Sequence, residues 1–189
     1  MLTAGLWLLL GPAPPALVYD RVAIAQGEWW RLVTGHLVHS DAEHALWDII
    51  ALALIGWVME SQGRDRVLLA ALAGMLAVNM GLWWWLPELE RYCGLSGMLN
   101  TLFVIALNDL WAEHRHPLIP LVAVGLAIKL ATESMARQSL FVHTLWPSVP
   151  EVHVAGCLGG LAFLGLERLI QLYRRHDWRQ HPGVTHHNH

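Results

Sequence analysis

Charged residues are scarce in this sequence. Asp, Glu, Lys and Arg make up 14% of the 189 residues, where an average soluble domain has roughly 25%. Hydrophobic residues make up 55%, and the mean hydropathy is +0.40. Several apolar runs reach 17–20 residues, the length that a helix needs to cross a bilayer core of about 30 Å. The composition therefore excludes an ordinary soluble domain and predicts a membrane protein with several spans.

Lysine and cysteine are also rare. One lysine and eleven arginines are scattered along a chain of net charge −3, so no basic stripe is available for a nucleic-acid backbone and nucleic acid is not an expected partner. Two cysteines, Cys93 and Cys157, are too few for a disulfide framework or a four-cysteine metal site, and are expected to be free thiols or at most one bridge. The absence of an HExxH motif removes the core ligands of an intramembrane zinc protease.

Six apolar segments predict an all-α membrane protein with six transmembrane helices. Residues 1–18 contain three prolines, so the first span is expected to be short or irregular. The other spans are expected at 44–60, 67–86, 95–112, 118–136 and 151–173. Residues 19–43 mix charges with tryptophan and histidine and are expected at the membrane interface. Residues 1–173 are thus predicted to form a single membrane domain, and the polar, histidine-rich residues 174–189 a disordered tail.

The basic residues of the loops predict the orientation, because cytoplasmic loops retain lysine and arginine. The side that holds both termini carries Arg64, Arg66, Arg115, Arg174, Arg175 and Arg179, and the other side carries Arg21, Arg31, Arg91 and Arg137. Both termini are therefore predicted to be cytoplasmic. The long loop of residues 19–43 is predicted to lie on the outer side.

Polar residues inside predicted spans are functional candidates, because a bilayer makes them expensive. Ser96 opens the fourth span within Gly94-Leu95-Ser96-Gly97, where the glycines leave the backbone around its hydroxyl open. His153 lies near the start of the sixth span, and Gly156 and Gly160 share its helical face and permit close helix packing. A serine–histidine hydrogen bond requires that closeness.

The predicted topology places these side chains at one depth. The second, fourth and sixth spans run in the same direction, so His44, Ser96 and His153 should all lie near the outer ends of their helices. A serine and a histidine at one level form a nucleophile with its general base, and such a hydrolase remains workable without an acidic third member. Asn100, one turn after Ser96, is a candidate to bind water or substrate.

Together these residues resemble the rhomboid intramembrane serine proteases across the whole six-span core. Gly94-Leu95-Ser96-Gly97 is similar to the family's GxSG, with Ser96 as nucleophile, and the sixth span's HxxG motif begins at His153, the implied base. His44 matches the histidine of HxxxN, which helps to bind the oxyanion. The first outer loop resembles the family's tryptophan–arginine motif. Structural roles are thereby implied for Glu28, Trp30, Arg31, Gly94, Gly97, Gly156 and Gly160.

Asp48 departs from this pattern, because the family has asparagine there. An ionised carboxylate only accepts hydrogen bonds and would repel an oxyanion, so Asp48 can serve as a donor only if it is protonated. His44 and the Ser96 backbone N–H are the expected oxyanion donors, with the Leu95 N–H as a further candidate. An ionised Asp48, one turn below His44, would instead orient that imidazole.

Within the family, the small size and the tryptophan-rich first loop resemble the rhombosortase branch. That branch implies an enzyme of the bacterial inner membrane, open to the periplasmic side, that removes the Gly-Gly-containing C-terminal sorting tail of exported proteins. The expected partners are those transmembrane tails and membrane lipid, and no cofactor or metal is expected. The alternative is a catalytically inactive relative that binds client transmembrane segments.

Some titratable residues keep more than one interpretation. His36 and His39 are either metal ligands together with His44 or interfacial histidines satisfied by backbone or water. Lys129 and Glu133 lie one turn apart in the fifth span, so they are expected to form an internal ion pair that lowers the cost of insertion, with a gating role as the alternative. The two cysteines are candidates to line the site.

Overall fold

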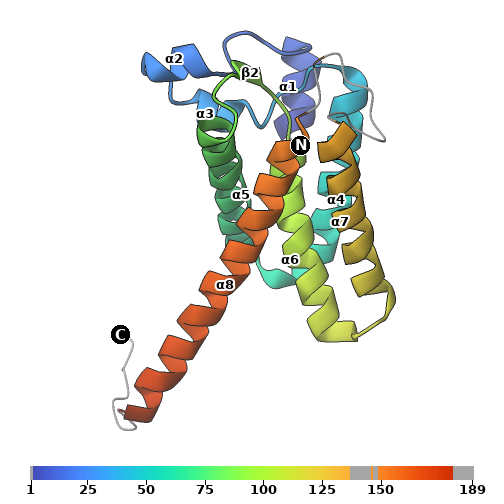
Figure 1. The fold of residues 1–189 in the computed structure, drawn as a ribbon, viewed down its shortest axis with the longest axis vertical. Helices are drawn as coiled ribbons and strands as arrows, with labels where there is room; N and C mark the ends of the chain where they lie inside the picture. Colours follow the sequence, from blue (N-terminus) through green and yellow to red (C-terminus); the bar gives the residue numbers. More distant parts are fainter. Residues whose placement is uncertain (1, 137–145, 147–148, 181–189) are drawn as a thin grey trace.

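The computed structural model describes residues 2–136, 146 and 149–180 and is mostly helical (Figure 1). Its elements are α1 (Leu2–Leu10), β1 (Tyr19–Asp20), α2 (Arg21–Ala25), α3 (Arg31–Thr34), α4 (Ala42–Met59), the 3-10 turn η1 (Glu60–Gln62), α5 (Arg64–Trp84), β2 (Arg91–Tyr92), α6 (Ser96–His114), α7 (Leu118–Ala136) and α8 (Pro150–Gln180).

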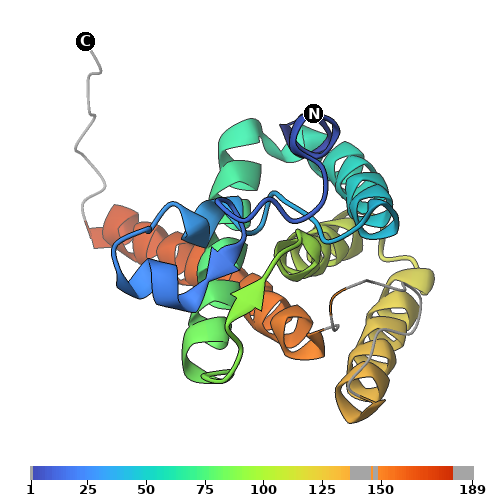
Figure 2. The same ribbon diagram turned by 90° about the horizontal axis from the view of Figure 1, so that it is seen from above.

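Helix α6 occupies the centre of the bundle. It packs against α4, α5, α7 and α8, and from above α7 stands at the margin (Figure 2). Met98, Leu102 and Ile105 of α6 are buried in the main hydrophobic core with Met59 and Ala70. The central helix is therefore held by apolar burial on several sides, which fixes the position of its first residue, Ser96.

Small residues bring α6 and α8 into backbone contact. A Cβ atom on Gly156 would collide with the carbonyl oxygen of Gly97, and one on Gly160 would lie 2.9 Å from the carbonyl oxygen of Thr101. The Thr101 hydroxyl donates to the carbonyl oxygen of Gly156 at 2.6 Å. Small side chains allow this close crossing, so the starts of the two helices meet.

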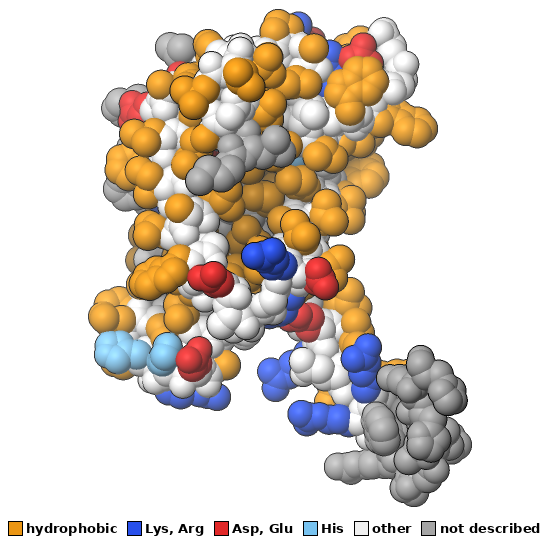
Figure 3. Space-filling view, turned by 180° about the vertical axis from the view of Figure 1, so that it is seen from behind, with side chains coloured by type: hydrophobic (Ala, Val, Ile, Leu, Met, Phe, Trp, Pro, Cys, Tyr) orange, Lys and Arg blue, Asp and Glu red, His pale blue; other side chains and the backbone are white. Residues whose placement is uncertain are grey.

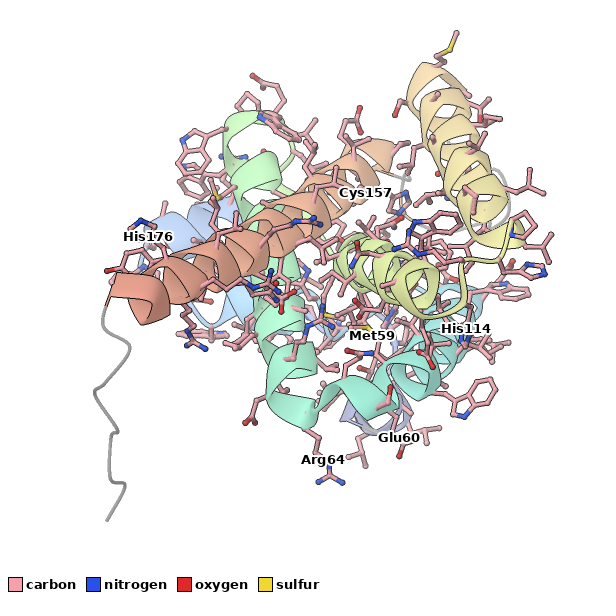
Figure 4. The ribbon with its side chains drawn as sticks, turned by 90° about the horizontal axis from the view of Figure 1, so that it is seen from below. Met59, Glu60, Arg64, His114, Cys157 and His176 are labelled. Atoms are coloured by element: carbon pink, nitrogen blue, oxygen red, sulfur yellow. The ribbon has the colours of Figure 1, made fainter. Side chains whose placement is uncertain are left out.

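Charged side chains gather at the end of the bundle remote from the start of α6, where Figure 3 shows them below a mostly hydrophobic surface. Figure 4, seen from below, shows Glu60, Arg64 and His114 at this end. Slightly deeper, Arg66 of α5 pairs with Asp109 of α6 at 2.6 Å and with Glu167 of α8 at 2.7 Å. These ion pairs connect three helices. Because they are partly buried, they stabilise the bundle more than an exposed ion pair would.

The opposite end carries the short elements that precede α4 and α6. Strands β1 and β2 pair antiparallel, with Tyr19 opposite Tyr92. Asp20 caps α2 by accepting the backbone N–H of Ala23 at 3.1 Å, and this hydrogen bond is the main cause that holds the pKa of Asp20 below its usual value. The pairing joins residues 19–20 directly to the segment that leads into Ser96.

The side chains of the predicted tryptophan–arginine motif bind backbone carbonyl groups of the segment before β1. Arg31 is buried, forms an ion pair with Glu28 at 2.7 Å and donates to the carbonyl oxygens of Pro15 and Val18 at 2.7 and 2.9 Å. The indole of Trp30 donates to the carbonyl oxygen at position 16, at 3.1 Å. A guanidinium can satisfy several acceptors at once, so this motif fixes the turn between α1 and β1.

Four helical segments of the described chain are long and apolar enough to cross a membrane: Ala42–Gln62, Arg64–Trp84, Leu118–Ala136 and Pro150–His176. They lie within a few residues of four predicted spans. Helix α6 matches a fifth in position, but polar residues such as Asn100, Asn108 and Asp109 lower its hydropathy. Six spans therefore stay a prediction.

Two boundaries differ from the sequence-based expectation. Helix α1 covers nine residues, about 14 Å, so it is too short to cross a bilayer core by itself; its helix ends before Pro12, where the prolines begin. At the other terminus α8 continues to Gln180, so disorder from residue 174 is wrong for residues 174–180. Arginine and glutamine are good helix formers that extend a helix already anchored by packing. Residues 181–189 lie outside the described part.

Candidate active site

Ser96 and His153 meet where α6 and α8 begin. The Nε2 atom of His153 lies 2.9 Å from the Oγ atom of Ser96, although 57 residues separate them in the sequence. Ser96 is the first residue of α6, and His153 is in the first turn of α8. This distance is within the range for proton transfer between a hydroxyl and an imidazole.

The turn before Ser96 requires glycine. Gly94 has φ +129°, and a Cβ atom there would lie 2.6 Å from both Cε1 and Nε2 of His44. Its backbone N–H donates to the carbonyl oxygen of Gly35 at 3.0 Å, and its own carbonyl oxygen accepts the Tyr92 hydroxyl at 2.9 Å. The positive φ and the close imidazole both exclude a side chain, so His44 packs directly against the turn that presents Ser96.

Asp48 is a buried acceptor with three polar neighbours. Its Oδ2 atom accepts the backbone N–H of Leu95 at 2.8 Å, lies 3.0 Å from Nε2 of His39 and lies 3.6 Å from Nε2 of His44. The Leu95 N–H is therefore committed to Asp48, and the structure does not offer it to an oxyanion as the sequence analysis suggested. A carboxylate attracts this donor more strongly than a neutral amide oxygen would.

His44 is held at its other ring nitrogen. Nδ1 lies 3.2 Å from the Ser40 hydroxyl, which itself donates to the carboxylate of Asp41 at 2.7 Å. Nε2 of His44 lies 3.6 Å from Oδ2 of Asp48, so both ring nitrogens have a polar neighbour that orients the ring.

His39 and Tyr92 complete this region, and the sequence analysis assigned neither of them a part beside Ser96. His39 is buried and its ring packs edge-on against His44, with centroids 4.9 Å apart. Tyr92 is buried beside Ser96 and Gly97; burial raises its pKa above the usual value, so the phenol stays neutral. Tyr92 is positioned by its pairing with Tyr19 in a sheet of two-residue strands. Strands this short leave no pattern in the sequence from which the pairing could be predicted.

The histidines considered as metal ligands separate into two environments. Single ligand atoms of His39, His44 and Asp48 lie within 4.8 Å of one another, and His39 and Asp48 are in direct hydrogen-bond contact at 3.0 Å. His36 lies apart from them, with Nε2 3.4 Å from Oδ1 of Asn79 and its ring against Tyr92. Burial lowers the pKa of His36 to about 4, so it is neutral at physiological pH.

Asn100 and Cys157 lie one helical turn inward of the site, whereas Cys93 precedes Ser96 and packs against Val18 and Val38. The side-chain amide of Asn100 donates to the carbonyl oxygen of Ser96 at 2.8 Å. Cys157 lies 3.8 Å from Oδ1 of Asn100 and lines an apolar cavity of about 480 Å³ between α6, α7 and α8 (Figure 4). Cys93 is buried and its pKa is raised to about 12 by burial. Both cysteines are free thiols, as one of the two expectations held.

The expected ion pair of the fifth span is present. Lys129 Nζ lies 2.6 Å from the Oε2 atom of Glu133. The same oxygen lies 3.4 Å from Nδ1 of His153, the ring nitrogen that faces away from Ser96. The sequence analysis did not foresee this second contact, because residues 133 and 153 belong to different helices.

Comparison with known proteins identifies the family of this chain. A family model described as the rhomboid domain matches residues 26–168. The chain belongs to the rhomboid family. YdcA of Bacillus subtilis (strain 168), whose name assigns it to the rhomboid proteases, is 26% identical over an alignment 189 residues long, gaps included, that covers 91% of this chain and 88% of YdcA. The rhomboid protease GluP of the same organism is 26% identical over 158 residues, which cover 79% of this chain and 29% of GluP. With four apolar helices, the rhomboid domain identifies a membrane protein.

Proposed function

We propose that this rhomboid-family protein is an intramembrane serine endopeptidase with Ser96 as nucleophile and His153 as general base. The observation that carries the proposal is the 2.9 Å distance between Oγ of Ser96 and Nε2 of His153. The relatives named as rhomboid proteases support the same activity.

The reaction proceeds through an acyl-enzyme. Oγ of Ser96 attacks a peptide carbonyl carbon while Nε2 of His153 takes its proton; the C–N bond then breaks and the leaving amine receives that proton. A water molecule next attacks the ester and gives its proton to His153, after which Ser96 leaves as a hydroxyl and the new carboxyl terminus is released. Serine and histidine supply all of the groups required, so no cofactor or metal enters these steps.

The oxyanion is stabilised by His44 and the backbone N–H of Ser96. His44 lies against the turn that holds Ser96, since a Cβ atom on Gly94 would touch its ring. A donor aimed at the position where negative charge develops contributes most of its stabilisation in the transition state. Asp48 lies 3.6 Å from Nε2 of His44 and orients its ring, and it does not act as a donor itself.

The site opens to the outer side of a six-span bundle in the bacterial inner membrane, with both termini cytoplasmic. The arginine distribution of the loops and the position of the dyad at the end remote from the Arg66 cluster support this orientation. Water reaches Ser96 from that side. The substrate's scissile bond must first leave a helical conformation, because helical carbonyls are shielded by their own hydrogen bonds.

The substrate class that we propose is the C-terminal sorting tail of exported proteins, a Gly-Gly motif followed by one hydrophobic span and a basic end. The support is the resemblance to the rhombosortase branch and the preference for helix-breaking glycine near the cleaved bond. Wild type and Ser96→Ala are compared in membranes against a set of tails with Gly-Gly, Ala-Ala and Leu-Leu at the junction. Cleavage of the Gly-Gly tail by wild type alone supports the proposal, and stable binding of all tails without cleavage favours a client-binding protein.

A further inference from the structure

Glu133 is buried on a helix whose other residues are exposed or only partly buried within this chain. Among the described residues of α7 it is the one buried side chain, with 0% of its surface exposed, while Met135 two residues later is 86% exposed. A buried carboxylate in a membrane-spanning helix is costly, and such residues commonly face a functional site. The direction in which Glu133 points therefore requires an explanation.

The carboxylate points at the side of His153 that is remote from Ser96. Its Oε2 atom lies 3.4 Å from Nδ1 of His153, whose Nε2 atom lies 2.9 Å from Ser96. Nδ1 is buried and has no hydrogen-bond partner within the described part of the chain. The 3.4 Å separation slightly exceeds the 2.7–3.2 Å of a direct N–H···O bond, and catalytic hydrogen bonds are often long before substrate binds.

Three helices thus align an acid, an imidazole and a hydroxyl. We propose that Glu133 is a positioning residue that orients His153 and keeps the proton on Nδ1, which leaves Nε2 free to accept the proton of Ser96. It also stabilises the imidazolium that forms as Ser96 attacks. This inference rests on the proposed serine protease function, and it replaces the dyad expected from the sequence with an acid-assisted arrangement.

Lys129 has a supporting role in this arrangement. Its ammonium lies 2.6 Å from the same Oε2 atom and its side chain is 30% exposed. The lysine provides the carboxylate with a counter-charge and limits the net charge buried beside His153. The competing explanation is that the two residues form only a structural ion pair that permits insertion of α7.

A charge exchange separates the two explanations. The double variant Lys129→Glu/Glu133→Lys keeps an i, i+4 ion pair on the same face, in the order that is the more favourable on a helix. It places an ammonium beside Nδ1 of His153 in place of the carboxylate. A structural pair tolerates this exchange, whereas a positioning carboxylate does not.

The measurements are kcat and KM for cleavage in membranes, with thermal unfolding in detergent as the check on folding. We expect the exchanged variant to lose about 10²-fold or more in kcat with KM changed by less than about threefold, a loss below the roughly 10⁴-fold that follows neutralisation of the acid in a serine–histidine–aspartate triad. Glu133→Asp retains the charge and should recover at least about a tenth of wild-type kcat.

The neutral double variant Lys129→Met/Glu133→Gln keeps the test decisive if the exchanged variant does not fold. It should lose about tenfold or more in kcat. If either folded double variant retains more than half of wild-type kcat, Glu133 is a structural residue and the inference is overturned while the protease function stands. If wild type itself cleaves no tail and binds no serine-directed reagent, the proposed function fails, and the role of Glu133 fails with it.

Discussion

The carboxylate of Asp48 accepts the backbone N–H of Leu95 at 2.8 Å, so helix α4 is joined directly to the turn that presents Ser96. The same carboxylate oxygen lies 3.0 Å from Nε2 of His39 and 3.6 Å from Nε2 of His44. An asparagine at this position has one acceptor oxygen and no charge. The aspartate therefore connects the turn that presents the nucleophile to the two neighbouring histidines.

Asp48→Asn should slow cleavage at neutral pH. The variant loses the carboxylate charge that orients the His44 imidazole, so we expect a loss on the order of the 10²–10³-fold that accompanies removal of one oxyanion donor, or less. Rate against pH for wild type and variant measures it, and the variant should be slower with a profile shifted to lower pH. An unchanged or faster variant at neutral pH would instead mean that Asp48 acts as a neutral acid.

Ser96→Ala and His153→Ala should each abolish proteolysis without unfolding the bundle. Neither change removes much apolar volume, and the two side chains act as one unit, so the double variant should be no slower than either single variant. Single-turnover cleavage in membranes checks this. Retention of more than about a tenth of the activity by His153→Ala is incompatible with a general base, whose contribution is typically 10²–10⁴-fold.

Gly156→Ala should destabilise the bundle, and Gly165→Ala on the same helix should not. A Cβ atom at position 156 collides with the carbonyl oxygen of Gly97, whereas nothing lies within 4 Å of one at position 165. Overpacking costs about 1–3 kcal/mol, and alanine in an open helical position gains about 0.5–1 kcal/mol over glycine. Denaturant unfolding in detergent should therefore shift in opposite directions, and equal shifts would contradict the close contact of α6 and α8.

Acidification should destabilise the fold through His36. Burial lowers the pKa of this histidine from about 6.5 to about 4, so between these values the unfolded chain binds more protons than the folded one. The free energy of unfolding is therefore fully retained above pH 6.5, falls as the pH drops from 6.5 to about 4, and levels off below that, with a total loss of about 3 kcal/mol. Unfolding of wild type and His36→Gln between pH 7.5 and 4 measures this, and identical pH dependence in both would place His36 in contact with water.

The helices and the meeting of Ser96 with His153 could be predicted because both follow from local information. Apolar runs fix the positions of α4 to α8, and alternating direction places the starts of α4, α6 and α8 at one level. Gly156 and Gly160 one turn apart indicate the close crossing. These are patterns within one helix or between helices whose order is known.

The second contact of Glu133 could not be predicted for the opposite reason. It depends on how far α7 is rotated about its axis and on its distance from α8, and neither quantity leaves a signal in a helix that is apolar nearly all round. The contact of Asp48 with His39 could not be predicted for a similar reason, because His39 lies before α4 in a segment without regular secondary structure. The proline-rich segment after α1 likewise has no period from which a span could be inferred.

Labelling by a serine-directed fluorophosphonate tests the central claim most directly. The reagent phosphonylates Oγ of Ser96 with loss of fluoride, and it reacts at a useful rate only when a base activates that hydroxyl. The account predicts that folded wild type in membranes or detergent is labelled once per chain, that Ser96→Ala is not labelled, and that His153→Ala is labelled at least about 10²-fold more slowly. Folded wild type that remains unlabelled, or label that persists in Ser96→Ala, would contradict it.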